Sequence, residues 1–248
     1  MDFFLEKNRL QERARDDVID QLFSPIKVTG WQNKRLKAPA ESKLDRDSSY
    51  KLARFAKVFC SDRAPNYCSE ESPLRPISQY AKEKVEIEKE LMEHPNAISF
   101  RLATVFGMSP RMRVDLLVND FTHRAVYDRF VVLFESHFKR NYIHVRDVSR
   151  VFQHALQCCD KMVGQIYNVG LSDSNISKKE LCEYIQKQLP EFIFSEAPVG
   201  KDPDQRNYIV SNEKIEATGF KTEFSLERGI NELIKGYTMI RNTQYGNV

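Results

Sequence analysis

Tyr80 and Lys84, in the segment ISQYAKEK (77–84), have types and spacing that could support acid–base chemistry. Positions i and i+4 of an α-helix share one face, so the lysine cation can lie against the phenol and stabilise its charged form. A phenolate held in this way can take a proton from a substrate hydroxyl. The same spacing also arises by chance in a lysine-rich chain, and by itself it favours ordinary side chains on a helix.

The segments around this pair predict a strand, a helix and a strand. KLARFAK (51–57) has apolar residues at helical spacing, and VFC (58–60) is a short apolar run typical of a buried strand. Ser78 is a candidate N-cap for a helix over 79–93. AISFRLATVFG (97–107) then predicts a strand that is buried on both faces. This order predicts an α/β fold with a parallel sheet.

The rest of the chain also alternates between helical and strand patterns. Helices are expected over 112–126, 145–159, 177–189 and 225–240, and strands over 129–135, 141–145 and 165–170. Ser177 and Ser225 are expected helix caps. Only Ser177 has a glutamate, Glu180, three residues later, so only that helix is predicted to begin with a capping box.

Composition restricts the class of protein. The net charge of +3 comes from interspersed residues of both signs, which gives no reason to expect nucleic-acid binding. No run of eighteen apolar residues occurs and the first residues are too charged for a signal peptide, so a cytoplasmic protein without membrane insertion is expected. The five cysteines are odd in number and have no CxxC spacing, which argues against a disulfide framework and a structural zinc site.

Glycine is unevenly distributed, and this bears on cofactor binding. Only Gly30 precedes Gly107, so the first hundred residues contain no glycine-rich turn that could cradle a phosphate. Residues 1–23 have an amphipathic helical pattern, and residues 24–49 are polar and turn-rich. The N-terminal region is therefore expected to be a helix followed by an irregular arm.

Several longer motifs occur in a fixed order after residue 50. They are EESPLRPISQYAKEKVEIEKEL, SFRLATVFGMSPRMRVDLLVND, KRNYIHVRDVSRVFQHAL, QIYNVG, and the stretch from DPDQRNYIVSNEKI through GFKTEFSLERGINELI. Together they resemble the extended short-chain dehydrogenase/reductase family, the NAD-dependent nucleotide-sugar epimerases and dehydratases. The resemblance extends over about four-fifths of the chain.

The resemblance implies a fold and an organisation. Residues 50–108 are expected to be the remnant of a Rossmann-like parallel sheet with its helices. Residues 109–248 are expected to form mainly a smaller α/β substrate-binding region, with some segments returning to the sheet. Residues 1–49 do not match the family, whose first half normally supplies the glycine-rich turn for the dinucleotide. The usual N-terminal cofactor-binding half is therefore expected to be missing from this chain.

The resemblance also implies roles for particular residues. Tyr80 and Lys84 would form the catalytic pair, and both would contact NAD or NADP. The third catalytic member would be a hydroxyl; counting back from Tyr67 puts Arg63 at its position, with Ser61 two residues away. A nucleotide-diphosphate sugar is the implied substrate. The residues implied to bind it are Thr104, Arg113, Asn119, Arg140 and Arg206, with the two last arginines on the phosphates.

Three interpretations of the whole chain remain open. The first is an NAD(P)-dependent nucleotide-sugar epimerase, dehydratase or reductase whose cofactor is held without the usual glycine loop. The second is a catalytically inactive nucleotide-sugar-binding or interaction module, which forms a homodimer or pairs with a full-length relative through the Tyr80 helix. The third is a fragment whose first fifty residues reflect a rearranged reading frame.

Two further clusters of polar residues favour structural roles. His144 and Asp147 stand three residues apart and could form a base pair or ligand pair, although the resembled family uses this segment structurally. His154, Cys158 and Cys159 have helical spacing suited to a metal, but no second pair of ligands is visible. No metal site is predicted.

Overall fold

The computed structural model describes residues 52–55, 68–74, 76, 79–197 and 207–243, all within the unit Ser49–Val248. The expectations for residues 1–49, the strand at 58–60 and the N-cap Ser78 lie outside these described residues. No helix in the described ranges combines the length and the apolar character needed to cross a membrane.

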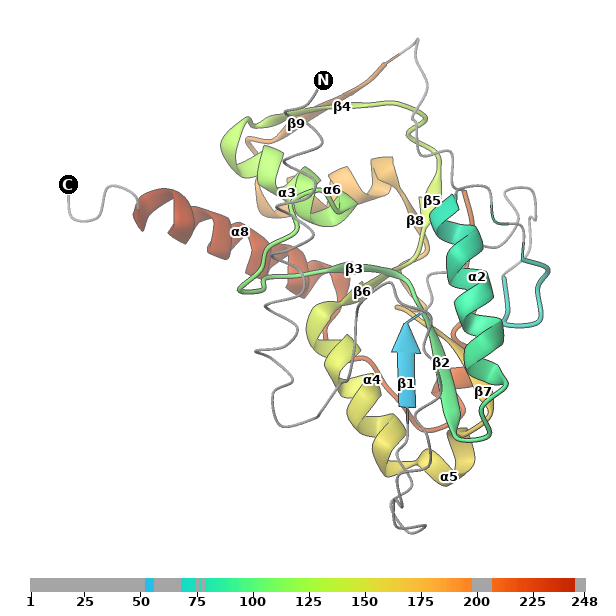
Figure 1. The fold of residues 1–248 in the computed structure, drawn as a ribbon. Coiled ribbons are helices and arrows are strands. Elements are labelled where there is room, and N and C mark those ends of the chain that lie inside the picture. The colour runs from blue at the N-terminus through green and yellow to red at the C-terminus, as the bar shows by residue number, and fades with distance from the viewer. Residues whose placement is uncertain (1–51, 56–67, 75, 77–78, 198–206, 244–248) are drawn as a thin grey trace, which may run out of the picture. The chain divides into compact units, whose positions relative to one another are not determined.

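A three-stranded parallel sheet supports the helix that carries Tyr80 (Figure 1). Its strands are β1 (Leu52–Phe55), β2 (Ala97–Leu102) and β7 (Gln165–Val169), with β2 in the middle. Helix α2 (Gln79–Met92) lies between β1 and β2 in the chain and packs on β2. A parallel strand–helix–strand crossover is therefore present, with β1 as its first strand, whereas the strand expected at 58–60 is not among the described residues.

One predicted element in this region is wrong. Helical spacing in KLARFAK predicts a helix over 51–57, but residues 52–55 form strand β1, in parallel register with Ala97–Phe100. A run this short fits both periodicities, and pairing with β2 decides the outcome because it supplies hydrogen bonds that a lone helical turn would lack.

The apolar segment 97–107 forms two strands instead of the single expected one. Up to Ala103 it pairs with β7, because the Ala103 amide donates to the Val169 carbonyl. The Thr104 amide donates to the Asn141 carbonyl instead. From there β3 (Thr104–Phe106) runs parallel to β6 (Tyr142–His144). The chain thus changes partner strands at residue 103, while the predicted burial of β2 on both faces is confirmed.

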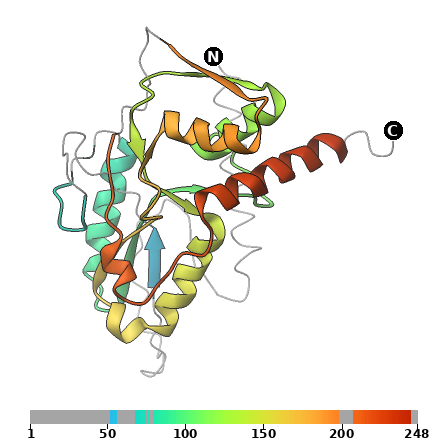
Figure 2. The same ribbon diagram turned by 180° about the vertical axis from the view of Figure 1, so that it is seen from behind.

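The remaining elements complete a mixed α/β fold (Figure 2). Strands β4 (Phe130–Leu133) and β9 (Ile193–Glu196) pair in parallel, and β5 (Lys139–Arg140) and β8 (Ile176–Ser177) pair antiparallel. The remaining helices are α3 (Leu117–Tyr127), α4 (Val145–Gln157), α5 (Cys159–Met162), α6 (Lys178–Gln188), α7 (Glu213–Glu216) and α8 (Leu226–Thr243). The predicted α/β class with parallel strand pairing is confirmed.

Two hydrophobic cores stabilise the described part of the chain. One lies between β2, β7 and α4 and includes Phe100, Val151 and Met162. The other joins α3, α6 and α8 and includes Leu181 and Leu233. Helix α3 begins at Leu117, five residues later than predicted, because residues 107–113 form a loop that Asn119 holds by hydrogen bonds.

Helix α6 begins with the predicted capping box. The Ser177 hydroxyl accepts the Glu180 amide at 3.2 Å, and the Glu180 carboxylate accepts the Ser177 amide at 2.7 Å. The Ser225 hydroxyl accepts the Arg228 amide at 3.2 Å, and residue 228 is an arginine instead of a glutamate, as expected for a cap without a box. The hydrogen bond from the Ser177 amide keeps the pKa of the Glu180 carboxyl below its usual value.

Replacing Glu180 by glutamine is expected to lower the free energy of unfolding at neutral pH, because the charged acceptor at the helix start is lost. Since the folded pKa of Glu180 is depressed, its contribution is present above the unfolded pKa and is lost as the pH falls through the folded pKa. Urea unfolding at several pH values measures the difference from the wild-type chain, which should shrink on acidification. The control is Glu183→Gln, an exposed site on the same helix, and a difference that does not depend on pH would contradict the prediction.

Candidate functional site

Tyr80 and Lys84 lie next to each other in the first two turns of α2. The Tyr80 side chain is 53% exposed. The Lys84 Nζ atom lies 5.4 Å from the centre of the Tyr80 ring. Because α2 leads back into the start of β2, its first turn lies near the carboxyl end of that strand, where open parallel sheets bind ligands. The pair is accessible to a ligand, and a cation lies beside the phenol.

A buried ion pair fixes α2 on the sheet. Glu88, two turns after Tyr80, is 3% exposed and accepts hydrogen bonds from both Nε and Nη2 of Arg101 on β2, the latter at 2.6 Å. The Ser99 hydroxyl donates to the same carboxylate at 3.0 Å. Arg101 Nη1 donates to the Glu70 carbonyl at 3.0 Å. Each polar group in this network has a partner. The helix that carries Tyr80 is therefore fixed both in its rotation about its own axis and in its position along β2.

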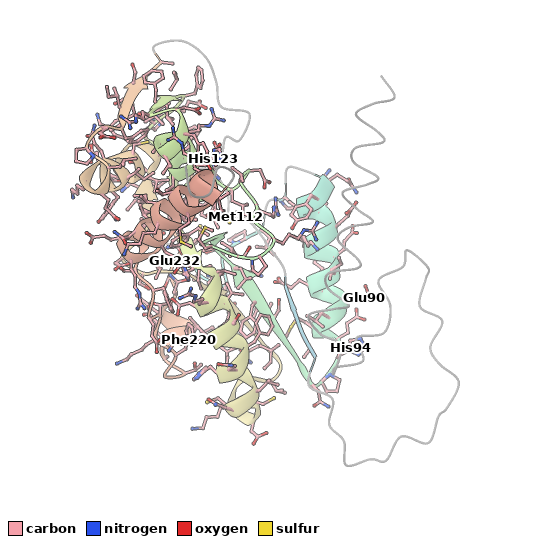
Figure 3. The ribbon with its side chains drawn as sticks, turned by 90° about the vertical axis from the view of Figure 1, so that its left-hand side faces the viewer. Glu90, His94, Met112, His123, Phe220 and Glu232 are labelled. Carbon is pink, nitrogen blue, oxygen red and sulfur yellow. The ribbon has the colours of Figure 1, made fainter. Side chains whose placement is uncertain are left out.

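Our sequence interpretation missed this ion pair. A signal was present, because Arg101 interrupts the apolar run AISFRL, and a buried arginine requires an acid. The spacing within α2 does not show which of its glutamates faces the sheet. By contrast, Glu90 is exposed and lies on the outer side of α2 (Figure 3).

Arg113 belongs to the loop before α3 and lies within electrostatic reach of Tyr80. Its guanidinium is 53% exposed and forms an ion pair with Asp115. The pKa of Arg113 is raised chiefly by the hydrogen bond to Asp115, and a smaller contribution comes from the charge of Tyr80. The charges of Arg113 and Tyr80, two residues that the resemblance assigns to one site, therefore influence each other.

Asn119 holds both ends of the loop that contains Arg113. Its Oδ1 atom accepts the Gly107 amide at 3.1 Å, and its Nδ2 donates to the Arg113 carbonyl at 2.9 Å. The side chain is 3% exposed. Its observed contacts position the loop. Binding of a diphosphate by Asn119 stays a prediction.

The other predicted substrate residues lie deeper in the fold. Thr104 is buried in β3. Arg140 is buried in β5, and its charge acts on Tyr142, whose phenol pKa is raised chiefly by burial. Ser61 and Arg206 lie outside the described residues, so their roles stay predictions.

His144 and Asp147 have the structural contacts that their segment led us to expect. Asp147 accepts the Glu223 and Phe224 amides at 3.0 Å, and His144 accepts the Arg146 amide at the start of α4. The His144 ring stacks on Phe224 with centroids 4.6 Å apart, and burial lowers its pKa. These contacts tie α4 to the segment before α8. Nowhere in the described ranges do three His, Cys, Asp or Glu side chains form a metal-binding group.

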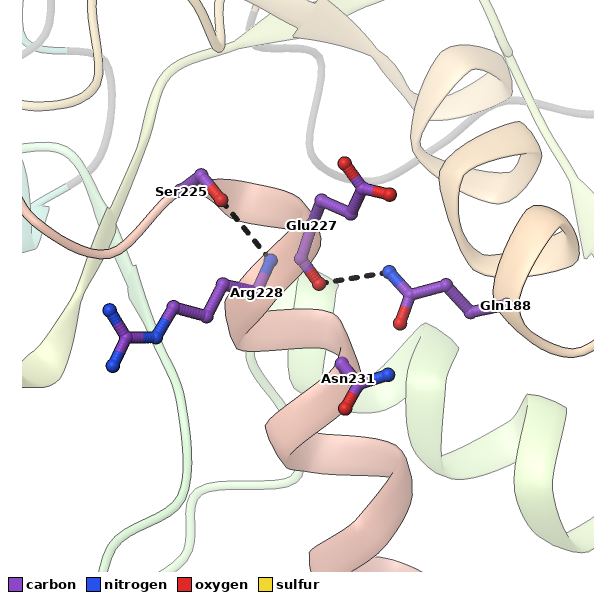
Figure 4. A pocket seen from close by; sticks show the side chains of 5 residues that line it. All are labelled: Gln188, Ser225, Glu227, Arg228 and Asn231. Atoms are coloured by element: carbon purple, nitrogen blue, oxygen red, sulfur yellow. Dashed lines mark hydrogen bonds between the residues drawn. The ribbon is translucent and has the colours of Figure 1, made fainter.

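An open hollow at the start of α8 is separate from the predicted site residues (Figure 4). It is lined by Gln188, Ser225, Glu227, Arg228 and Asn231. The Gln188 amide donates to the Glu227 carbonyl at 2.8 Å, and Ser225 caps the helix. These polar groups satisfy helix ends, so we assign the hollow a structural origin and place the candidate site at Tyr80.

The chain is similar to known proteins in sequence and in fold. An uncharacterised protein of Schizosaccharomyces pombe is 24% identical over 205 residues, which are 68% of this chain and 55% of that protein. The dTDP-glucose 4,6-dehydratase of Bacillus anthracis, solved with NAD, matches this chain with a TM-score of 0.65 at 21% identity. The match covers 79% of this chain and 63% of the dehydratase.

The UDP-glucose 4-epimerase of Thermotoga maritima, solved with UDP-glucose, matches this chain with a TM-score of 0.66 at 20% identity. The match covers 77% of this chain and 63% of the epimerase. The present chain thus spans between half and two-thirds of the length of these proteins. The sequence model of the NAD dependent epimerase/dehydratase family matches residues 60–170. Through this match, residues 60–170 are similar to the NAD dependent epimerase/dehydratase family, and the fold of the chain is the Rossmann-like fold of the two solved enzymes.

Proposed function

We propose that this chain binds a nucleotide-diphosphate sugar and that Tyr80 exchanges a proton with a sugar hydroxyl in an epimerase- or dehydratase-type reaction. The observation that carries the proposal is the exposed Tyr80 phenol with Lys84 beside it, on a helix that the Glu88–Arg101 pair holds rigidly. The Lys84 ammonium lies over the Tyr80 ring, and an exposed phenol can exchange a proton with a sugar hydroxyl.

The arginines would bind the anionic part of the substrate. A guanidinium can form two parallel hydrogen bonds to phosphate oxygens, which suits Arg140 and Arg206 to the diphosphate. Arg113, whose pKa is influenced by the charge of Tyr80, would contact the sugar or the adjoining phosphate. Thr104 and Asn119 would shape the site by fixing β3 and the loop before α3.

NAD or NADP is the expected cofactor, and the chain fits it only in part. Tyr80 and Lys84 offer contacts for the nicotinamide side. A dinucleotide pyrophosphate needs a close backbone approach at a glycine-rich turn, and the sequence has only Gly30 before Gly107. Bound NAD or NADP would supply hydride transfer. We therefore assign this chain only substrate binding and proton transfer, with the dinucleotide pyrophosphate held by groups that this sequence does not contain.

The glycine distribution favours a second candidate, a catalytically inactive nucleotide-sugar-binding or interaction module. Such a module would keep Arg113 and Arg140 for the nucleotide sugar without redox chemistry. It would act as a homodimer or with a full-length relative, and α2 is the proposed contact helix. This candidate predicts ligand binding without turnover.

Ligand titration distinguishes the two candidates. UDP-, GDP- and dTDP-sugars are expected to raise the thermal unfolding temperature of the chain, since a ligand that binds only the folded state stabilises it. Calorimetry with NAD(H) and NADP(H), and turnover of the stabilising sugar, test the enzyme. Tyr80→Phe should lower turnover by about 10²-fold or more while nucleotide-sugar affinity is retained.

The possible results have different meanings. Sugar binding without turnover or dinucleotide binding would support the inactive module. Full activity in Tyr80→Phe would remove the proposed role of the phenol. The absence of stabilisation by any of the three nucleotide sugars at millimolar concentration would overturn both candidates.

A further inference from the structure

A thiol and an imidazole lie side by side at the carboxyl end of α4. This end of the helix packs against the core of β2, β7 and α4, and not against the core of α3, α6 and α8. Cys158 Sγ lies 3.9 Å from His154 Nδ1. The other ring nitrogen, His154 Nε2, lies 2.8 Å from Thr218 Oγ1. The His154 ring also packs near Phe220, with centroids 5.6 Å apart. Cys158 at the end of α4 and two residues that follow α7 thus contact this imidazole.

The hydrogen-bond pattern favours one tautomer of His154. The Thr218 hydroxyl has one proton and donates it to the Ile215 carbonyl at 2.6 Å. With that proton used, Thr218 Oγ1 accepts from His154, and on this basis we assign the imidazole proton to Nε2. The Nδ1 atom is left with its lone pair, and this is the nitrogen that faces Cys158 Sγ. The imidazole is thus in the form that can accept a proton from the thiol.

Cys158 differs from the other described cysteines in its accessibility. Its side chain is half-buried, whereas Cys68, Cys159 and Cys182 are buried. Burial raises the pKa of the Cys182 thiol to about 12, which keeps that sulfur protonated and unreactive. The described part of the chain therefore has one partly accessible thiol, which lies next to a base. Its buried thiols serve as unreactive controls within the same molecule.

We propose that Cys158 is a modification site that forms mixed disulfides with small disulfide compounds, with His154 as its base and Thr218 as the positioning residue. A nucleophile, a base and a third group that orients the base are the arrangement that activates cysteine in general. This activity is separate from the nucleotide-sugar function, since it uses none of the residues assigned to that site.

The reaction balances without any further reactant. His154 Nδ1 takes the thiol proton as Cys158 Sγ attacks one sulfur of the small disulfide. A new S–S bond forms, the old S–S bond breaks, and its electron pair leaves on the second sulfur. His154 returns the proton to that leaving sulfur. The imidazole ends neutral, and one small thiol is released for each Cys158 that is modified.

A chromogenic aryl disulfide, added to the intact chain, tests the proposal. We expect a fast phase of thiol release, and peptide mass spectrometry should place the adduct on Cys158 and leave the adjacent Cys159 unmodified. Cys158→Ser should abolish the fast phase. His154→Gln keeps a donor for Thr218 but removes the base, and should slow the reaction at Cys158 by about tenfold or more.

Two further variants separate base chemistry from structural effects. Thr218→Val removes the acceptor for Nε2–H, so it should slow the reaction at Cys158 with little change in its accessibility. Leu156→Ala, at a 63% exposed position of α4, should react like the wild-type chain. Thermal unfolding is measured for each variant. Equal rates for wild type and His154→Gln, or an adduct at the buried cysteines instead of Cys158, would overturn the proposal.

Discussion

Replacing Glu88 by alanine is expected to lower the free energy of unfolding by about 3–5 kcal/mol, because it leaves the Arg101 guanidinium buried without its charge partner. Arg101 is 8% exposed, and the Ser99 hydroxyl would lose the same acceptor. A whole domain is typically stable by only about 5–15 kcal/mol, so this loss is large. Urea unfolding followed by circular dichroism measures it.

Glu90→Ala is the matched control, since Glu90 is an exposed glutamate on the same helix. We expect it to change the stability by no more than about 0.5 kcal/mol. The double variant Glu88→Met/Arg101→Met removes both charges and should recover much of the loss. If Glu88→Ala and Glu90→Ala were equally mild, the ion pair would not hold α2, and the rigid placement of Tyr80 would lose its basis.

Changing Gly170 to alanine is expected to lower the free energy of unfolding by about 3 kcal/mol. A Cβ atom at this position would overlap Asn141 Oδ1, and it would lie 2.8 Å from Asn141 Cγ and 3.0 Å from the Cβ of Ala103. Asn141 cannot withdraw easily, because it is fully buried and its Nδ2 donates to the Leu171 carbonyl at 2.6 Å. Thermal and urea unfolding measure the effect.

This substitution also tests how the site is built. Gly170, Asn141 and Ala103 meet where the chain passes from β2 to β3, and Arg140 precedes Asn141. The double variant Gly170→Ala/Asn141→Gly removes the overlapping side chain, so it should be less destabilised than the sum of the two single changes. Simple additivity of the two changes would show that the overlap does not limit the packing.

Sequence periodicity predicted an element correctly where the element is long or where capping residues mark its ends. The 79–93 helix was predicted nearly as observed, because its apolar positions repeat at helical spacing and acidic and basic residues fill its outer face. The capping box at Ser177 was also predicted correctly, since two side chains at fixed spacing satisfy it locally. The helix predicted over KLARFAK was wrong, because the four-residue strand that forms there exists only through its pairing with β2.

By itself, the sequence determined the α/β class, the Tyr80–Lys84 spacing and the family motifs, because these depend on neighbours within a few turns of chain. Only the tertiary structure decided that Glu88 meets Arg101, that Asn119 holds the Arg113 loop and that His154 turns its Nδ1 atom toward Cys158. Glu88 and Arg101 lie on different elements, Asn119 reaches back six residues to the loop before its own helix, and the orientation of His154 depends on Thr218, 64 residues away. The physical reason is that burial and hydrogen-bond partners are set by how the elements pack in three dimensions, which local periodicity does not encode.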